Sequence, residues 1–130
     1  MCFIEQKLKW KKKKIYKPKP FWIQVSSKKI ETDGTALLEL SDMTFEELLS
    51  KIQPDQVIGF STEGKKSNCE DISQIITKNS CIVIGGFQKG HFNQKTSKQF
   101  SELRSIYPDS LESHVVASRI LYEYEKTIFI

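Results

Sequence analysis

The amino-acid sequence predicts an α/β protein with a mostly parallel sheet that carries helices on both faces. Residues 56–61 (QVIGFS) and 81–86 (CIVIGG) have the length of strands and are largely apolar. Such runs are typical of parallel strands that are buried on both sides. Segments with the helical spacing of apolar residues alternate with these runs along the chain. This alternation is the pattern of a parallel sheet covered by helices.

The elements before the first buried strand rest on turn and capping signals. Segment 21–25 fits either a short strand or the first turns of a helix, and the choice stays open at this point. Segment 35–40 (TALLEL) is expected to be a strand because it follows an Asp-Gly turn. The next segment is expected to be a helix, because Thr44 and Glu47 have capping-box spacing and Pro54 follows its apolar stripe.

The chain has 130 residues, which is the size of one domain. Its remaining predicted elements alternate between strands and helices, and a short apolar segment at 105–107 lies between the last two predicted helices. The predicted order is a buried strand at 56–61, a short helix at 69–77, a buried strand at 81–86, a helix at 96–105 and a final helix at 110–126.

The composition argues against several classes of protein. No apolar run approaches the ~20 residues that a membrane-spanning helix needs, and no secretory signal follows Met1. The cysteines Cys2, Cys69 and Cys81 lack both CxxC spacing and a clustered histidine, which argues against a disulfide framework and a zinc site. We therefore expect a cytoplasmic protein with no membrane segment and no metal.

The charge is distributed unevenly along the chain. Between Lys7 and Lys19 there are eight lysines and no acidic residue, whereas the sequence beyond Lys19 carries 12 basic and 15 acidic residues. Trp10 and Tyr16 are interleaved with the lysines, a pattern that suits phosphate neutralisation and base stacking. Residues 1–20 are therefore interpreted as a basic N-terminal arm. A solvated and partly disordered tail is the alternative interpretation.

Three short loops are expected at the carboxyl ends of strands. Segments 61–64 (STEG), 85–90 (GGFQKG) and 105–109 (SIYPD) each follow a strand candidate. Ligands of open parallel sheets bind beyond the carboxyl ends of the strands, so we expect the three loops to lie close together. Glycines in such a loop allow the backbone to approach a ligand closely.

The glycine loop lacks the features of a nucleotide-hydrolysis motif. Gly85 and Gly90 have P-loop spacing, but that motif requires Lys and then Ser or Thr after the second glycine, where His91 and Phe92 stand. The GxGxxG pattern of dinucleotide-binding folds is also absent. The loop alone leaves two interpretations open, a small-ligand site and a tight strand exit.

The segments VIGFSTEGK, IVIGGFQKGHF and SIYPDSLESHVVASRILYEYE together resemble the C-terminal half of the ribosome-biogenesis pseudouridine N1-methyltransferases of the SPOUT class, especially the archaeal members. The similarity extends from about Thr35 to Lys126. It implies that residues 21–130 form the C-terminal part of a SPOUT-type trefoil-knot methyltransferase domain, without its N-terminal strands. It also implies a homodimer, S-adenosylmethionine as cofactor, and methylation of a pseudouridine in small-subunit ribosomal RNA.

The same resemblance implies which residues bind the cofactor. The first two loops would hold it, and the third would close over its adenine and methionine parts. A sulfonium methyl donor is already activated, so alignment of donor and acceptor is the main requirement, and the catalytic residues stay unknown. The implied cofactor-binding residues are Ser61, Thr62, Gly64, Gly85, Gly86, Gly90, Arg104, Ser105, Ile106, Tyr107, Pro108, Asp109 and Leu111.

RNA binding is expected from the basic arm and the segment that follows it. The family carries two arginines there, where this chain has Lys19 and Ile23, so bidentate phosphate binding and one charge are missing. An alternative function is a non-catalytic RNA-binding or ribosome-assembly module that uses the lysine-rich arm. The expected RNA-binding residues are Lys12, Lys13, Lys14, Lys17, Lys19 and Phe21.

The two histidines have structural interpretations. His91 is expected to be a solvent-facing loop residue in preference to a substrate contact, and His114 a packing or dimer-interface residue. No Asp or Glu stands out in the sequence as a general base.

Overall fold

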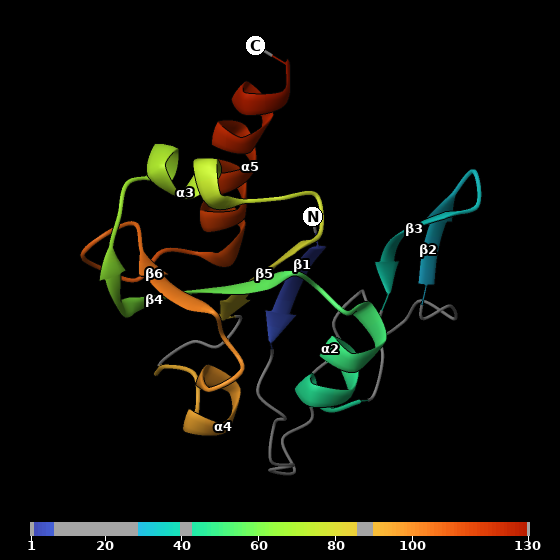
Figure 1. Ribbon diagram of the computed structural model, residues 1–130, viewed down its shortest axis with the longest axis horizontal. Coiled ribbons are helices and arrows are strands. Elements are labelled where there is room, and N and C mark those ends of the chain that lie inside the picture. The colour runs from blue at the N-terminus through green and yellow to red at the C-terminus, as the bar shows by residue number, and fades with distance from the viewer. Residues whose placement is uncertain (1, 7–28, 40–42, 86–89, 130) are drawn as a thin grey trace, which may run out of the picture.

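The computed structural model describes residues 2–6, 29–39, 43–85 and 90–129 (Figure 1). Four strands form one sheet in the order β1-β5-β4-β6, and each neighbouring pair is parallel. The predicted mostly parallel sheet is therefore confirmed. Its strands are β1 (Cys2–Gln6), β4 (Gln56–Lys66), β5 (Ser80–Gly85) and β6 (Glu102–Ser105).

A small hairpin stands apart from this sheet. Strands β2 (Lys29–Thr32) and β3 (Thr35–Glu39) pair antiparallel and form a separate sheet of two strands. Asp33 and Gly34 connect them with φ angles of 50° and 76°, so both residues of this tight turn are left-handed. The strand expected after the Asp-Gly turn is thus confirmed up to residue 39, while its hairpin partner was not expected from the sequence.

The predicted capping box is present at the start of the first described helix. The Thr44 amide donates to Oε2 of Glu47 at 2.7 Å, and the Glu47 amide donates to Oγ1 of Thr44 at 3.2 Å. The helix ends where Gln53 adopts a left-handed φ of 51°, directly before Pro54. The described helices are α2 (Phe45–Ile52), α3 (Cys69–Ile75), α4 (Gln94–Ser97) and α5 (Ser113–Phe129).

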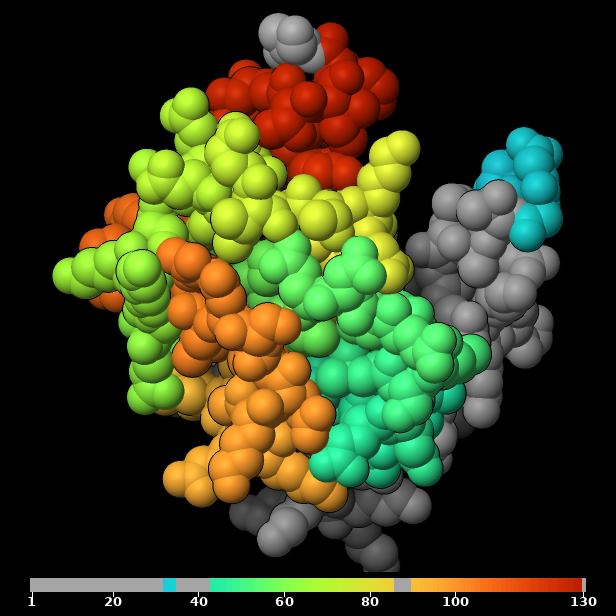
Figure 2. All heavy atoms as spheres, viewed as in Figure 1, coloured from blue at the N-terminus to red at the C-terminus, as the bar shows by residue number. Residues whose placement is uncertain are grey.

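Helices α3 and α5 cover one face of the sheet. Ile58 and Phe60 of β4 point to this face, where they pack with Ile72 of α3 and with Val116 and Ile120 of α5. Alternate residues of β5 join the same cluster, as the period of two in a strand requires. The last turns of α5 extend beyond the body of the molecule at the top of the view (Figures 1 and 2).

The opposite face is covered by α2 and by the segment around α4. Val57 and Val83 point to this face, where aromatic rings pack over them. The ring of Phe100 lies edge-on to those of Phe45 and Phe92, with centroid distances of 6.0 and 5.0 Å. Figure 2 shows α2 in contact with the α4 segment on this side of the molecule. Helices on both faces, as predicted, are therefore confirmed.

The predicted helix at 96–105 is wrong. Only Gln94–Ser97 is helical, and residues 102–105 form the edge strand β6. The Ser101 amide donates to the Val57 carbonyl at 2.8 Å, and the Val57 amide donates to Oγ of Ser101 at 3.0 Å. Pairing with the open edge of β4 thus overrides the local helical spacing of the apolar residues.

Two further differences concern strand ends. The strand expected at 56–61 continues to Lys66, and the strand at 2–6 was not expected. Strand β1 pairs with β5 and forms one edge of the sheet. The resemblance implied a domain without N-terminal strands, in which this edge of β5 would be open. Segment 21–25 lies outside the described residues.

No helix within the described ranges has the length and apolar character that a bilayer crossing needs. Within the same ranges, no group of three or more His, Cys, Asp or Glu residues lies close enough together to hold a metal ion. Cys69 is a free thiol, and burial raises its pKa.

Replacement of Ile120 tests the packing of α5 on the sheet. The side chain is fully buried between α5 and the strands, so we expect Ile120→Ala to lower the free energy of unfolding by about 2–5 kcal/mol. Urea denaturation followed by circular dichroism measures the change. Glu125→Ala on the exposed side of the same helix is the control and is expected to change stability by less than about 0.5 kcal/mol. Equal effects of the two variants would contradict this packing.

Candidate functional site

A cleft opens at the carboxyl ends of β5 and β6, beside residues 60–62 of β4. Its volume is about 670 Å³, and β4, β5, β6 and the start of α5 all contribute to its walls. The three segments predicted to lie close together therefore do so, at least at their described residues. The lining residues are Phe60, Ser61, Thr62, Ile84, Gly85, Gly90, His91, Phe92, Arg104, Ser105, Ile106, Tyr107, Asp109, Ser110, Leu111, Glu112, Ser113, Val115 and Val116.

The first wall of the cleft is a bulge within β4. Phe60 and Lys65 both lie opposite Arg104 of β6, so the residues between them leave the ladder. Segment 61–64 was expected to be a loop after a strand, but it is extended chain inside a longer strand. Four residues without a partner in β6 displace the backbone outward, which brings Ser61 and Thr62 to the cleft.

Gly64 lies at the end of this bulge and has a different role from its neighbours. It is not among the lining residues of the cleft. A Cβ at this position would lie 2.5 Å from the carbonyl carbon and 2.7 Å from the amide nitrogen of Arg104. Gly64 therefore allows two backbones to approach closely where β4 rejoins β6.

The second wall is formed by the two ends of the glycine segment. Gly85 ends β5, and Gly90 has a φ of 102°, with no atom of the described residues within 4 Å of the position that a Cβ would occupy, chain neighbours aside. A φ in this range favours glycine, so the backbone there would be strained by any side chain. Gly86, which was also predicted to bind the cofactor, lies outside the described residues.

The third wall follows β6. Ser105 is buried, and its hydroxyl donates to the carbonyl of Tyr107 at 3.0 Å. The Ser67 amide donates to the Ser105 carbonyl at 2.9 Å, which ties this segment to the end of β4. The ring of Tyr107 lies 5.7 Å from the guanidinium carbon of Arg119 on α5. Pro108, although predicted, is not among the lining residues.

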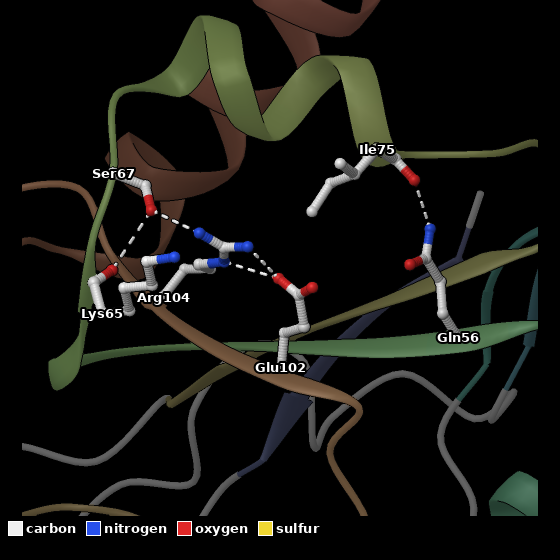
Figure 3. Close-up of polar contacts among 6 residues, drawn as sticks. All are labelled: Gln56, Lys65, Ser67, Ile75, Glu102 and Arg104. Atoms are coloured by element: carbon white, nitrogen blue, oxygen red, sulfur yellow. Dashed lines mark hydrogen bonds and ion pairs between the residues drawn. The ribbon is translucent and has the colours of Figure 1, made fainter.

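The guanidinium group of Arg104 is already paired within the protein (Figure 3). Its Nε donates to Oε2 of Glu102 at 2.6 Å, and its Nη1 donates to Oγ of Ser67 at 2.8 Å. A second guanidinium nitrogen also pairs with the Glu102 carboxylate. Because the side chain is only 17% exposed and its charge is compensated, Arg104 lines the cleft without bringing an unpaired cation to it.

The start of α5 contributes lining residues that were not predicted from the sequence. Ser110, Glu112 and Ser113 precede or begin the helix, and Val115 and Val116 follow on its inner side. The amides of Val115 and Val116 donate to the Glu112 carbonyl at 3.0 and 3.2 Å. The helical spacing of apolar residues in the final helix predicts an apolar side that includes Val115 but not Val116, and the polar residues had no signal in the sequence.

His91 connects the glycine segment with the β4 bulge. Its Nδ1 lies 3.3 Å from Oγ of Ser61, and its Nε2 lies 3.5 Å from Oε1 of Glu63. The imidazole is 45% exposed, as a loop histidine is expected to be, and it also lines the cleft. Its neighbour Phe92 lines the cleft as well, so this part of the chain belongs to the site.

The RNA-binding residues expected from the sequence lie outside the described part of the chain. These are Lys12, Lys13, Lys14, Lys17, Lys19 and Phe21.

Comparison with known protein families identifies the family of this chain. The model of the EMG1/NEP1 methyltransferase family matches residues 25–125, which is most of the chain. The chain belongs to this family. The EMG1/NEP1 match includes α2, α3 and α4, most of α5, and the three strands that contribute to the cleft, β4, β5 and β6. The resemblance inferred from the three loops is thereby confirmed.

Individual relatives share moderate sequence identity with the chain. The ribosomal RNA small subunit methyltransferase Nep1 of Methanothrix thermoacetophila is 31% identical over 80 residues, which are 62% of this chain and 35% of that protein. Nep1 of Thermoplasma acidophilum is 28% identical over 99 residues, or 76% of this chain and 43% of that protein. Nep1 of Staphylothermus marinus is 31% identical over 86 residues, or 65% and 37% respectively.

A solved structure shares the fold. The crystal structure of Archaeoglobus fulgidus Nep1 bound to S-adenosylhomocysteine superposes with a TM-score of 0.55 at 23% sequence identity, over 78% of this chain and 45% of that one. The chain thus spans less than half the length of these EMG1/NEP1 relatives.

Substitution of Gly64 tests whether its role is backbone packing. A methyl group would meet the Arg104 backbone at 2.5 Å, so we expect Gly64→Ala to lower the free energy of unfolding by about 1–3 kcal/mol. Chemical denaturation measures the change. Thr62→Ala, in the same bulge but with an exposed side chain, is the control and is expected to retain stability within about 0.5 kcal/mol. A fully stable Gly64→Ala chain would show that the two backbones separate at little cost.

Proposed function

We propose that the cleft binds S-adenosylmethionine and that the chain takes part in methylating nitrogen 1 of a pseudouridine in small-subunit ribosomal RNA. The observation that carries this proposal is the convergence of the β4 bulge, the ends of β5 and β6, and the start of α5 around one cleft. Membership of a methyltransferase family supports it. The relatives named ribosomal RNA small subunit methyltransferases support the substrate class, and the S-adenosylhomocysteine bound to Archaeoglobus fulgidus Nep1 supports the cofactor.

The size and chemistry of the cleft fit this cofactor. Its volume of about 670 Å³ lies in the range of small-molecule sites, roughly 300–1,000 Å³. Apolar side chains such as Ile84, Ile106 and Val116 suit an adenine ring. The carboxylates of Asp109 and Glu112 also line the cleft, and they match a ligand that carries a sulfonium and an ammonium group.

The proposed task of the lining residues is to bind and align. When bound, the cofactor supplies a methyl group that is already activated on a sulfonium. Ser61, Thr62, Gly85 and Gly90 would hold it, and segment 105–109 would close over it. A fixed geometry removes much of the entropic cost of bringing donor and acceptor together. Gly64 would contribute indirectly, because it positions the bulge that carries Ser61 and Thr62.

We propose the basic arm as the RNA-binding element, because lysines without neighbouring acids neutralise phosphates. The lining of the cleft includes two carboxylates and no unpaired cation among the described residues, so the cleft itself is a poor site for a polyanion. An RNA-binding module without catalysis, in which the arm alone is active, is the second candidate function.

The remaining expectations from the resemblance are also proposals. We propose a homodimer that uses the exposed side of α5, where Leu121, Tyr122, Ile128 and Phe129 are between 40% and 78% exposed. Their spacing places them on one side of the helix, and we propose that a second copy of this chain packs against this side. The free thiol of Cys69 supports a reducing cytoplasmic location. The trefoil knot stays a prediction.

Isothermal titration with S-adenosylhomocysteine tests the cofactor site. We expect the chain to bind at micromolar strength and Gly90→Val to weaken binding at least about tenfold, or 1.4 kcal/mol, because valine would enter the space that the ligand needs. Gly34→Val is a matched control, since Gly34 also has a positive φ and open space around it but lies in the distant hairpin turn.

The control separates strain from damage to the site. If both glycine variants weaken binding equally, strain or misfolding is the cause. A folded wild-type chain that does not bind S-adenosylhomocysteine would contradict the proposed cofactor.

Removal of the arm lysines tests the RNA proposal. We expect joint replacement of Lys12, Lys13 and Lys14 by Ala to weaken binding to a ribosomal RNA fragment and to reduce the slope of log K against log salt by about 0.7 for each phosphate that is no longer neutralised. Fluorescence anisotropy at several salt concentrations measures both quantities. Joint replacement of Lys65, Lys66 and Lys78 by Ala removes the same charge from the body and is the control. An unchanged salt slope in the arm variant would contradict the assignment.

A further inference from the structure

Three polar side chains at the edge of the cleft are linked by one hydrogen bond and one ion-pair contact. Oγ of Ser61 lies 3.3 Å from Nδ1 of His91, and Nε2 of the same imidazole lies 3.5 Å from Oε1 of Glu63. The Glu63 amide also donates to Oγ of Ser61 at 3.3 Å. Ser61 and His91 line the cleft, and Glu63 is 61% exposed on its outer side.

This arrangement favours one tautomer of His91. An ionised carboxylate only accepts hydrogen bonds, so the contact between Nε2 and Glu63 favours the tautomer with its proton on Nε2. Nδ1 is then the free acceptor of the neutral imidazole, and the Ser61 hydroxyl donates to it. Of the two lone pairs on Oγ of Ser61, one accepts from the Glu63 amide. The second is left to accept a proton from a group bound in the cleft.

We infer that Ser61 and His91 form the path by which the acceptor ring loses its proton during methyl transfer. This inference rests on the proposed function. Methylation of a ring nitrogen that carries hydrogen requires that proton to leave. As the bond from nitrogen to the methyl carbon forms, the bond from carbon to sulfur breaks, and its electron pair stays on sulfur. The ring proton passes to Oγ of Ser61, and the hydroxyl proton of Ser61 passes to Nδ1 of His91.

The resulting imidazolium ion has a partner in place. Glu63 faces the opposite nitrogen and stabilises the positive charge that His91 acquires. In this scheme Ser61 is the catalytic residue that touches the acceptor, His91 receives the proton through it, and Glu63 is a positioning residue. The bulge in β4 is what allows this, because it removes Ser61 and Glu63 from the ladder with β6 and places both beside His91.

Other groups that line the cleft lack this connection. Asp109 and Glu112 carry carboxylates there, but no described hydrogen bond links either side chain to a hydroxyl group of the cleft. Carboxylates beside a cationic cofactor are better suited to compensating its charge than to removing a proton. His114, the second histidine, is exposed in the first turn of α5 and does not line the cleft.

The test is methyl transfer by the full chain from S-adenosylmethionine labelled in its methyl group to a synthetic RNA hairpin that contains pseudouridine. We expect His91→Ala to lower kcat on the order of 10²–10⁴-fold, because general base catalysis contributes a factor of that size. The KM for RNA and the affinity for S-adenosylhomocysteine are expected to change less than about threefold. Added imidazole is expected to restore a measurable part of the missing turnover.

Companion variants separate proton transfer from structural damage. Ser61→Ala is expected to lower kcat like His91→Ala but without rescue by imidazole, because the relay to the acceptor is then missing. Glu63→Gln is expected to lower kcat by about tenfold. His114→Ala, the matched control, is expected to retain the wild-type rate.

Each outcome decides between explanations. If the wild-type chain transfers methyl groups and His91→Ala does so at the same rate, the inference is wrong while the proposed function stands. If His91→Ala loses both turnover and S-adenosylhomocysteine binding and imidazole restores neither, His91 has only a structural role. If the wild-type chain transfers no methyl group, the proposed function fails and this inference fails with it.

Discussion

The parallel pairing of β4 with β5 on one side and β6 on the other is the constraint on which the cleft depends. Parallel strands run in the same direction, so pairing brings the ends of β5 and β6 beside the β4 bulge at residues 61–64. The buried first half of β4 holds the register, with Ile58 fully enclosed between the helices and the sheet. Residues 61–64 of the same strand leave the ladder with β6 and contribute one wall of the site, and Lys65 and Lys66 rejoin the ladder. A single strand thus supplies both the core and the cleft.

Features with a local cause could be predicted from the sequence. The Thr44 and Glu47 side chains lie within one helical turn of each other, so their spacing alone specifies the cap. The run from Cys81 to Ile84 is buried in full, as its composition indicates. The meeting of the three loops followed from the order of elements along the chain, without knowledge of any contact between them.

Features with a distant cause could not be predicted in this way. Whether residues 102–105 are strand or helix depends on the open edge of β4, because Phe100 and Leu103 have the three-residue spacing of a helix face. Strand β1 forms only because β5 is there to pair with it, and in this parallel pair the backbone of Cys2 lies in register with that of Cys81. The role of Gly64 depends on the backbone of Arg104, which lies in another strand. In each case the deciding partner is far away in sequence and leaves no local pattern.

The charges of the chain favour different binding places for the two proposed ligands, the arm for RNA and the cleft for the cofactor. The arm carries eight lysines between Lys7 and Lys19, whereas the cleft carries the carboxylates of Asp109 and Glu112, and Glu102 neutralises Arg104 beside it. An RNA backbone is attracted to the first and repelled by the second, and exposed charges act over about 10 Å at 0.1 M salt. A cationic cofactor has the opposite preference. The part of an RNA best able to enter such a cleft is an uncharged ring, and a neutral imidazole linked through a hydroxyl group can accept its proton without adding a further negative charge to the site.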